Sequence, residues 1–134
     1  MKIDGKCHCG FITYEADVDP DEVYLCHCTD CQSISGSAFR WAVPVAEAAF
    51  KLLSGEPKTY VKRSESGAMN RQLFCPDCAS PLYSISIGAG PKVFNLRLGT
   101  ARQRAKLRPT AQYWCRSARD WAVVKEDSRQ IDTQ

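Results

Sequence analysis

The sequence predicts a mainly β domain with short helical turns, and two observations support this. Turn signals rich in glycine, proline and aspartate recur at short intervals along the whole chain, which is typical of an all-β domain. No internal repeat, low-complexity tract or linker divides the chain. A chain of 134 residues, 44% of them hydrophobic, can bury a core of its own. We therefore expect a single domain over residues 1–134.

The strands are expected where β-favouring residues lie between turn residues. Residues 11–18 begin with Phe, Ile, Thr and Tyr and indicate a strand that ends at an Asp-Pro-Asp turn. Residues 39–43 alternate Phe, Trp and Val on one face, and Pro44 should end this second strand because proline lacks an N–H donor. Further strands are expected at residues 50–53, 58–62, 71–74, 82–87, 92–98 and 112–116.

Helical structure should be scarce. Residues 46–49 can form one helical turn between two strands. The other helix we expect begins at Thr29 or Asp30, because either side chain can cap a helix N-terminus. It should stop at Gly36, since glycine adopts the left-handed conformation that closes many helices. This helix is short.

The N-terminal residues decide how the cysteines are interpreted. They lack the apolar stretch and the small-residue cleavage site of a secretory signal. The most apolar stretch, residues 41–50, is far shorter than the roughly 18 residues that a membrane-spanning helix needs. We therefore expect a cytoplasmic protein with no membrane partner. Thiols stay reduced there, and clustered cysteines then serve as metal ligands or catalysts.

The charges are unevenly distributed although the net charge is only +3. An acidic segment near residues 15–22 contrasts with a basic one at residues 97–108. The basic segment lacks the interleaved aromatic residues of a nucleic-acid surface, so we do not expect a nucleic-acid partner. A small anionic ligand would suit it. Its cations are Arg97, Arg102, Arg104, Lys106 and Arg108.

Seven of the eight cysteines form three tight clusters. Cys-x-Cys and Cys-x-x-Cys segments let two thiolates converge on one tetrahedral ion. The most economical pairing along the chain joins the first cluster with the last and makes a closed, structural four-thiolate site. This four-cysteine group consists of Cys7, Cys9, Cys75 and Cys78.

The middle cluster, the three-cysteine group, supplies Cys26, Cys28 and Cys31. Three protein ligands leave a fourth position open, which distinguishes catalytic zinc from structural zinc. His27 or Cys115 could instead close the tetrahedron. Disulfides and an iron-sulfur cluster are further alternatives for the whole set of cysteines.

The two histidines, His8 and His27, each stand between two cysteines. Adjacent side chains diverge when the flanking thiolates converge on a metal, so these histidines are expected around the site or in solvent. His27 is the better candidate for a general base because it adjoins the open site.

Three segments together resemble a known family. They are Gly5-Lys6-Cys7-His8-Cys9-Gly10, then Cys26-His27-Cys28-x-x-Cys31 with Ser35-Gly36-Ser37-Ala38-Phe39, and then Arg71-x-x-Phe74-Cys75-x-x-Cys78. This pattern is similar to that of the glutathione-dependent formaldehyde-activating enzymes, which include centromere protein V. The resemblance runs from about Gly5 to Trp121, and it implies a β-tent fold.

The resemblance also implies two zinc ions per chain. The four-cysteine group corresponds to the family's structural zinc site, and the three-cysteine group corresponds to its catalytic zinc site. The chain departs from the family at two positions. Ala79 stands where a glycine is usual after the last cluster, and Gln32 stands where a basic residue is frequent after the middle one.

The function implied by the resemblance is that of a zinc-dependent carbon-sulfur lyase similar to S-(hydroxymethyl)glutathione synthase. A thiol such as glutathione would be activated for addition to formaldehyde or a related small electrophile. The alternative is a non-catalytic, zinc-stabilised module that binds a thiol, a metal or a macromolecular partner.

Further expectations concern the surroundings of the three-cysteine group. Arg40 and Arg71 can lie near the metal and hold the carboxylates of an anionic thiol, because a guanidinium binds a carboxylate through two hydrogen bonds. The second zinc should be the more labile one. Cys115 is expected to be a small buried residue in a strand and not a metal ligand.

Overall fold

The computed structural model describes residues 1–64, 66–122 and 128–133, and they form a mainly β fold with two sheets. The small sheet has the order β1-β2-β5, with β1 Lys2–Lys6, β2 Thr13–Asp17 and β5 Phe50–Ser54. The large sheet has the order β11-β10-β3-β4-β9-β8-β7-β6. Its strands are β3 Tyr24–Cys26, β4 Arg40–Ala46, β6 Lys58–Arg63, β7 Met69–Phe74, β8 Pro81–Ser86, β9 Val93–Arg97, β10 Ala111–Tyr113 and β11 Arg129–Gln130.

Helical structure is confined to short pieces. The α-helix α1 covers Thr29–Ser35, and it ends at Gly36, whose φ of 64° is left-handed. Single 3-10 turns lie at Pro20–Glu22, Glu47–Ala49, Leu98–Thr100, Arg104–Lys106 and Cys115–Ser117. Within the part of the chain that the structure describes, the helices are too short and too polar to cross a bilayer.

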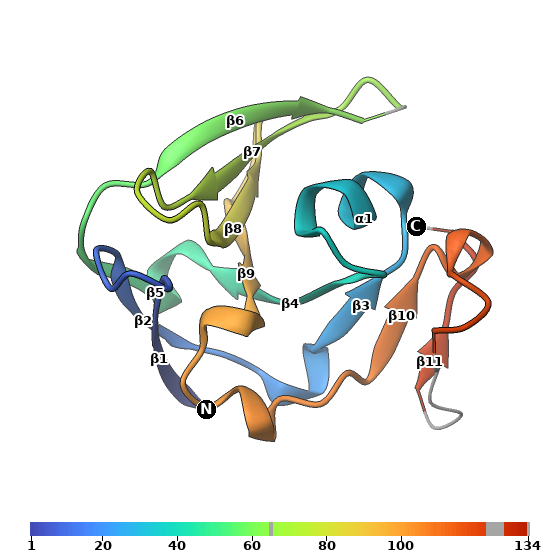
Figure 1. The fold of residues 1–134 in the computed structure, drawn as a ribbon, viewed down its shortest axis with the longest axis horizontal. Coiled ribbons are helices and arrows are strands. Elements are labelled where there is room, and N and C mark those ends of the chain that lie inside the picture. Colours follow the sequence, from blue (N-terminus) through green and yellow to red (C-terminus); the bar gives the residue numbers. More distant parts are fainter. Residues whose placement is uncertain (65, 123–127, 134) are drawn as a thin grey trace.

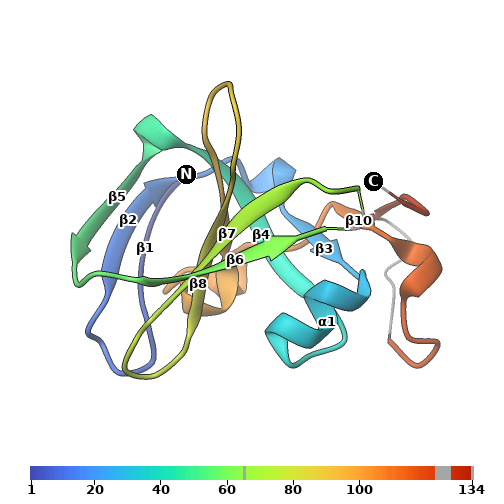
Figure 2. The same ribbon diagram turned by 90° about the horizontal axis from the view of Figure 1, so that it is seen from above.

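The large sheet is strongly curved. Figure 1 shows β6 and β7 at one end of the curve, β3 and β10 at the other, and α1 in the hollow between them. An ion pair from Lys62 to Asp30, 3.0 Å long, joins β6 to the helix in this hollow. In the view from above, the small sheet lies apart from α1, on the other side of β4 (Figure 2).

The two faces of the large sheet differ because successive side chains of a strand point to opposite faces. Val43, Val45 and Leu96 belong to the main hydrophobic core, together with residues of the small sheet such as Tyr14. The alternate residues on β9, Asn95 and Arg97, are polar. The apolar face thus packs against the small sheet, and the polar face is free to form a site.

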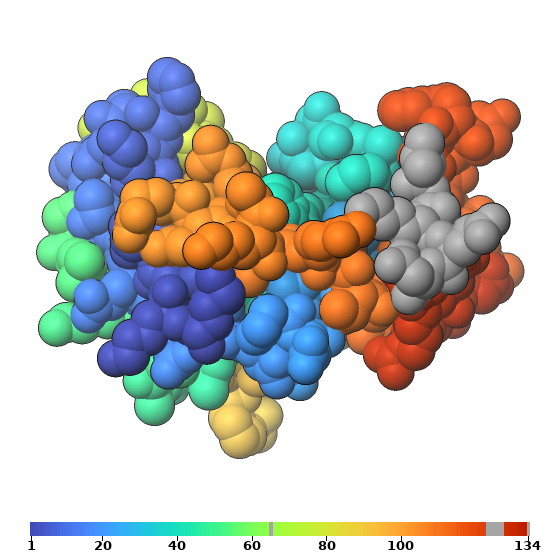
Figure 3. Space-filling view, turned by 90° about the horizontal axis from the view of Figure 1, so that it is seen from below, coloured from blue at the N-terminus to red at the C-terminus, as the bar shows by residue number. Residues whose placement is uncertain are grey.

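The segment after β9 holds the small sheet against the rest of the fold. Ala101 forms an isolated bridge with Gly5, and the N–H of Arg102 donates to the carbonyl of Asp4 at 2.8 Å. The Arg102 side chain also pairs with the Asp4 carboxylate. In Figure 3 this segment, coloured orange, crosses the face of the molecule beside the N-terminal residues.

The predicted strands and helix are confirmed to within a few residues, with three corrections. Pro44 lies inside β4 and does not end it. The pairing with β3 stops at Ala42, so Pro44 faces a partner strand on one side only and the missing N–H is tolerated. The cap of α1 is Cys28, whose Sγ accepts from the N–H of Cys31, and not Thr29 or Asp30.

The third correction concerns residues 112–116. The strand ends at Tyr113, Trp114 adopts a left-handed φ of 56°, and Cys115 begins a 3-10 turn. Cys115 is half-buried there, so it is not the buried strand residue that the alternation predicted. Three of the described strands were not predicted. β1 contains polar residues and forms a hairpin with β2, whereas β3 and β11 are short and are defined by parallel pairing with β10.

Candidate functional site

The four-cysteine group lies between the two sheets. Cys7 and Cys9 belong to the turn between β1 and β2, and Cys75 and Cys78 belong to the turn between β7 and β8. The four Sγ atoms lie within 4.8 Å of one another. Two of the sulfur-sulfur distances are 3.6 Å, from Cys7 to Cys9, and 3.7 Å, from Cys9 to Cys75. The structure therefore brings together the clusters that the sequence paired.

Backbone N–H groups surround the sulfur atoms of this group. The N–H of Ile12 donates to Cys7 Sγ at 3.3 Å, and the N–H of Asp77 donates to Cys75 Sγ at 3.4 Å. A hydrogen bond with Ser80 lowers the pKa of Cys78 to about 5. Donors aimed at sulfur favour thiolates, which are the form that binds metals.

Ala79 closes the second turn in the left-handed conformation, with φ of 63°, and its N–H donates to the Cys75 carbonyl at 2.9 Å. Glycine adopts this conformation without strain, whereas alanine does so at a penalty of roughly 1–2 kcal/mol. The departure from the family's usual glycine therefore leaves the turn in place and strains one residue.

The sulfur geometry fits zinc. An ion bound tetrahedrally at about 2.3 Å from each sulfur requires sulfur-sulfur distances of about 3.8 Å, close to those of the four-cysteine group. A disulfide requires about 2.05 Å, and all eight cysteines are free thiols. The two groups of cysteines could thus hold two metal ions. The four-cysteine group would fill all four coordination positions of its ion, and the three-cysteine group would leave one position open.

The three-cysteine group is built from one short segment. Cys26 ends β3, Cys28 caps α1 and Cys31 lies in the first turn of α1. The three Sγ atoms lie within 4.8 Å of one another, and Cys28 is half-buried while the other two are buried. Hydrogen bonds from Cys26 and Cys31 lower the pKa of the Cys28 thiol. The hydrogen bonds within the group and burial raise the pKa values of Cys26 and Cys31, so binding of a metal would have to displace protons from these two thiols.

His27 is not part of the cluster formed by the three sulfur atoms. It is 1% exposed, its Nε2 lies 2.8 Å from Gln112 Oε1, and its ring packs edge-on against Phe39. Gln112 in turn donates to Ser128. His27 lines neither of the cavities beside the cysteines. A buried side chain in this position can hold the Cys26–Cys28 segment in place, but it is poorly placed to transfer a proton to a molecule in either cavity.

Gln32, the second departure from the family, has a structural role here. Its side-chain amide donates to the His27 carbonyl at 2.7 Å and to the Ser117 carbonyl at 3.0 Å. It thereby ties the loop that carries Cys26 and Cys28 to the 3-10 turn at Cys115–Ser117. Cys115 Sγ itself lies outside both cysteine groups.

Arg40 lies beside the three-cysteine group, as the sequence predicted. It pairs with Cys26 across the β3-β4 ladder. Its guanidinium lies over the Tyr24 ring at 5.7 Å, and Nη2 donates to the Tyr24 hydroxyl at 3.3 Å. The Nε atom is buried and has no partner among the described residues.

Arg71 is not brought to the site. It is exposed on β7, and the alternation of that strand turns its neighbours Asn70 and Gln72 toward the cysteines instead. The cation that the structure places there is Arg97, 8% exposed, whose Nη2 donates to Gln72 Oε1 at 2.8 Å. Arg97 belongs to the basic segment that the sequence indicated as suitable for a small anionic ligand, and the alternation of Asn95 and Arg97 on β9 is what places it on the polar face of the sheet.

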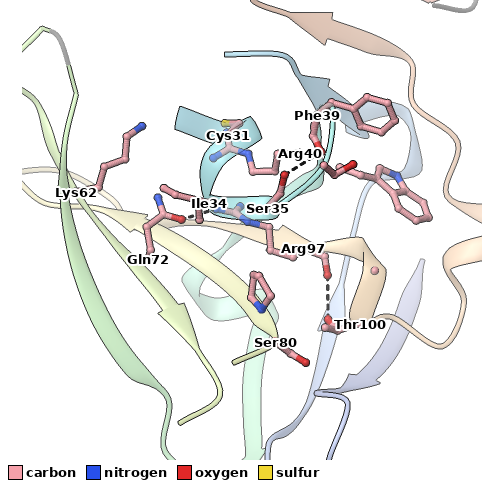
Figure 4. A pocket seen from close by; sticks show the side chains of 14 residues that line it. Cys31, Ile34, Ser35, Phe39, Arg40, Lys62, Gln72, Ser80, Arg97 and Thr100 are labelled. Atoms are coloured by element: carbon pink, nitrogen blue, oxygen red, sulfur yellow. Dashed lines mark hydrogen bonds between the residues drawn. The ribbon is translucent and has the colours of Figure 1, made fainter. Parts of the chain in front are cut away.

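Two cavities open beside the three-cysteine group, and Cys31, Arg40 and Lys62 line both of them. One, of about 380 Å³, has apolar walls that include Ile34 and Phe39, and it contains the arginines at its polar side (Figure 4). The other, of about 580 Å³, is lined by polar residues and by all three cysteines. A small molecule in either cavity would lie close to the open metal position.

Comparisons with known proteins agree with this geometry. The family model described as glutathione-dependent formaldehyde-activating enzyme matches residues 2–117. A crystal structure of a Rhodobacter sphaeroides protein is similar in fold, with a TM-score of 0.56 and 15% sequence identity, and the match covers 72% of this chain and 85% of that one. The search of curated proteins gave no match.

Proposed function

Since this chain belongs to the glutathione-dependent formaldehyde-activating enzyme family, we propose that it activates a small thiol, such as glutathione, for addition to formaldehyde or a related small carbonyl compound. The observation that carries the proposal is the set of three converging thiols with two cavities beside it. Seven cysteines would hold two zinc ions, a structural one at the four-cysteine group and a catalytic one at the three-cysteine group.

A zinc ion with an exchangeable fourth ligand stabilises the thiolate form of a bound thiol. Three thiolate ligands give the site a net charge of −1 and make it a weak Lewis acid, so activation of a thiol suits it better than activation of water. Cys26, Cys28 and Cys31 supply this ligand set. The cytoplasm, which we expect for this chain, would keep them reduced.

In the reaction the thiol sulfur forms a bond to the carbonyl carbon, and the carbonyl π electrons move to oxygen. The oxygen then takes up a proton equivalent to the one that the thiol lost, so the product is a hydroxymethyl thioether with no net redox change. The reverse reaction breaks the same carbon-sulfur bond. Arg40, next to Cys26, would orient an anionic substrate and stabilise negative charge.

The test is the rate of S-hydroxymethylglutathione formation, followed by exchange NMR with zinc-reconstituted protein. We expect the rate to exceed that of glutathione and formaldehyde alone, and Cys28→Ser to abolish the excess. Cys115→Ala is the matched control, because Cys115 lies outside both groups, and it should retain the rate. Zinc-replete protein without any excess rate would leave the non-catalytic thiol-binding module as the function.

A further inference from the structure

Two arginines lie on the same face of the large sheet as the three-cysteine group. Arg40 is directly opposite Cys26, and Arg97 is opposite Ala42, one diagonal step from Arg40. Direct cross-strand neighbours have Cβ atoms about 5 Å apart and diagonal ones about 7–8 Å. Both guanidiniums line the 380 Å³ cavity together with Cys31 (Figure 4).

Neither arginine has a carboxylate partner among the described residues. Lys62, the third cation at this cavity, is neutralised by Asp30. Arg97 donates to neutral acceptors, the side chain of Gln72 and the carbonyl of Asn95. Arg40 contacts the Tyr24 hydroxyl, and its buried Nε is unpartnered.

The charges do not balance without another anion. A zinc ion with three thiolates carries one negative charge, whereas Arg40 and Arg97 carry two positive ones. Burial, followed by the charge of Arg40, lowers the pKa of Arg97 to about 9, so it is still charged at neutral pH. Buried charges are normally paired, because an isolated one is strongly disfavoured away from water.

The cavity also suits an organic acid better than an inorganic ion. Ile34, Phe39 and Trp41 line it together with the two arginines. Its volume of about 380 Å³ lies within the usual range for small-molecule sites. A planar guanidinium binds a carboxylate through two parallel hydrogen bonds, and a second guanidinium can donate further hydrogen bonds to the same carboxylate oxygens.

We propose that Arg40 and Arg97 form a carboxylate-binding site beside the three-cysteine group, so that one of the reacting molecules is an acid. Its place in catalysis rests on the proposed function, but the binding site itself does not. The carboxylate can belong to the thiol or to the carbonyl compound. Arg97 is then the residue that selects acids over their neutral analogues.

Binding of matched acid and amide pairs tests this directly, by calorimetry on zinc-loaded protein and without turnover. The thiol pair is N-acetylcysteine and N-acetylcysteinamide, and the carbonyl pair is glyoxylate and glyoxylamide. We expect the acid of at least one pair to bind about tenfold or more tightly than its amide, as for a charge-assisted contact. The pair that shows the preference identifies the source of the carboxylate. Equal affinities within both pairs would overturn the proposal.

Variants then assign the preference to the arginines. Arg97→Gln should reduce acid affinity to that of the amide, and Arg97→Lys should retain part of the preference. Arg71→Gln is the matched control, because this arginine is exposed and outside both cavities, and it should bind as wild type. A purely structural role would instead weaken acid and amide equally, which would refute the assignment.

The thermal stability of Arg97→Gln without ligand provides an independent readout. Removal of an unpaired buried charge should leave the melting temperature unchanged or higher. If the variant does not fold, the acid and amide comparison on wild type still decides the proposal. Acid-selective binding without any carbon-sulfur chemistry would contradict the proposed reaction and leave the carboxylate site standing.

Discussion

Loss of the four-cysteine group should unfold the protein. Its two halves come from turns far apart in the chain, since Cys9 and Cys75 are 66 positions apart. A cross-link that closes a loop of this length lowers the conformational entropy of the unfolded chain. In the entropic model this raises the free energy of the unfolded chain by about 4 kcal/mol. Binding of a structural zinc ion contributes about 10–16 kcal/mol in zinc-finger peptides. These contributions are comparable to the whole free energy of unfolding of a typical domain, about 5–15 kcal/mol, so loss of the site should unfold the protein.

The perturbation is Cys75→Ser, and the readouts are zinc content by mass spectrometry and urea unfolding followed by circular dichroism. Cys75 is fully buried, so a serine there also buries a hydroxyl. Cys9→Ser separates the two effects, because Cys9 is exposed and its replacement removes only a metal ligand. Both variants should be unfolded or aggregated.

The matched control is Cys28→Ser in the three-cysteine group. It should remain folded and contain about one zinc per chain, because its ligands come from one short segment and close no long loop. A soluble Cys9→Ser or Cys75→Ser protein with a cooperative transition of wild-type midpoint would refute the reasoning. The metal would then be dispensable for the fold.

Three further predictions concern metal lability and packing. A mild chelator should remove the zinc of the three-cysteine group first, with the circular dichroism spectrum unchanged; simultaneous release of both ions with unfolding would argue against an open site. Cys115→Ala should retain two zinc ions per chain, and loss of one equivalent would make Cys115 a ligand. Gly5→Ala should lower the free energy of unfolding by roughly 1–3 kcal/mol in urea titrations, because its Cβ would collide with Tyr14 and the Thr100 carbonyl. Gly99→Ala, whose Cβ meets nothing within 4 Å, is the control and should change stability by less than about 1 kcal/mol.

Local sequence determined the ligand sets. Cys-x-Cys and Cys-x-x-Cys spacings bring two sulfur atoms together within one turn, whatever the rest of the chain does. The same is true of α1, whose end at Gly36 depends on the conformational freedom of a single residue. These features were predictable because the interactions that define them span only a few positions. The prediction failed locally where Cys28, a member of the three-cysteine group, also serves as the helix cap.

The surroundings of the three-cysteine group depended on the tertiary structure. Arg71 is four positions before Cys75 in the sequence, yet the pleat of β7 directs its side chain away from the cavities, whereas Arg97 reaches the 380 Å³ cavity from β9. Strand register decides which face a side chain occupies, and a shift of one residue reverses it. That register is fixed by pairing between distant strands and by burial of the apolar face against the small sheet. For this reason the sequence alone determined which residues can hold metal, and only the folded sheet decided which cations lie beside them.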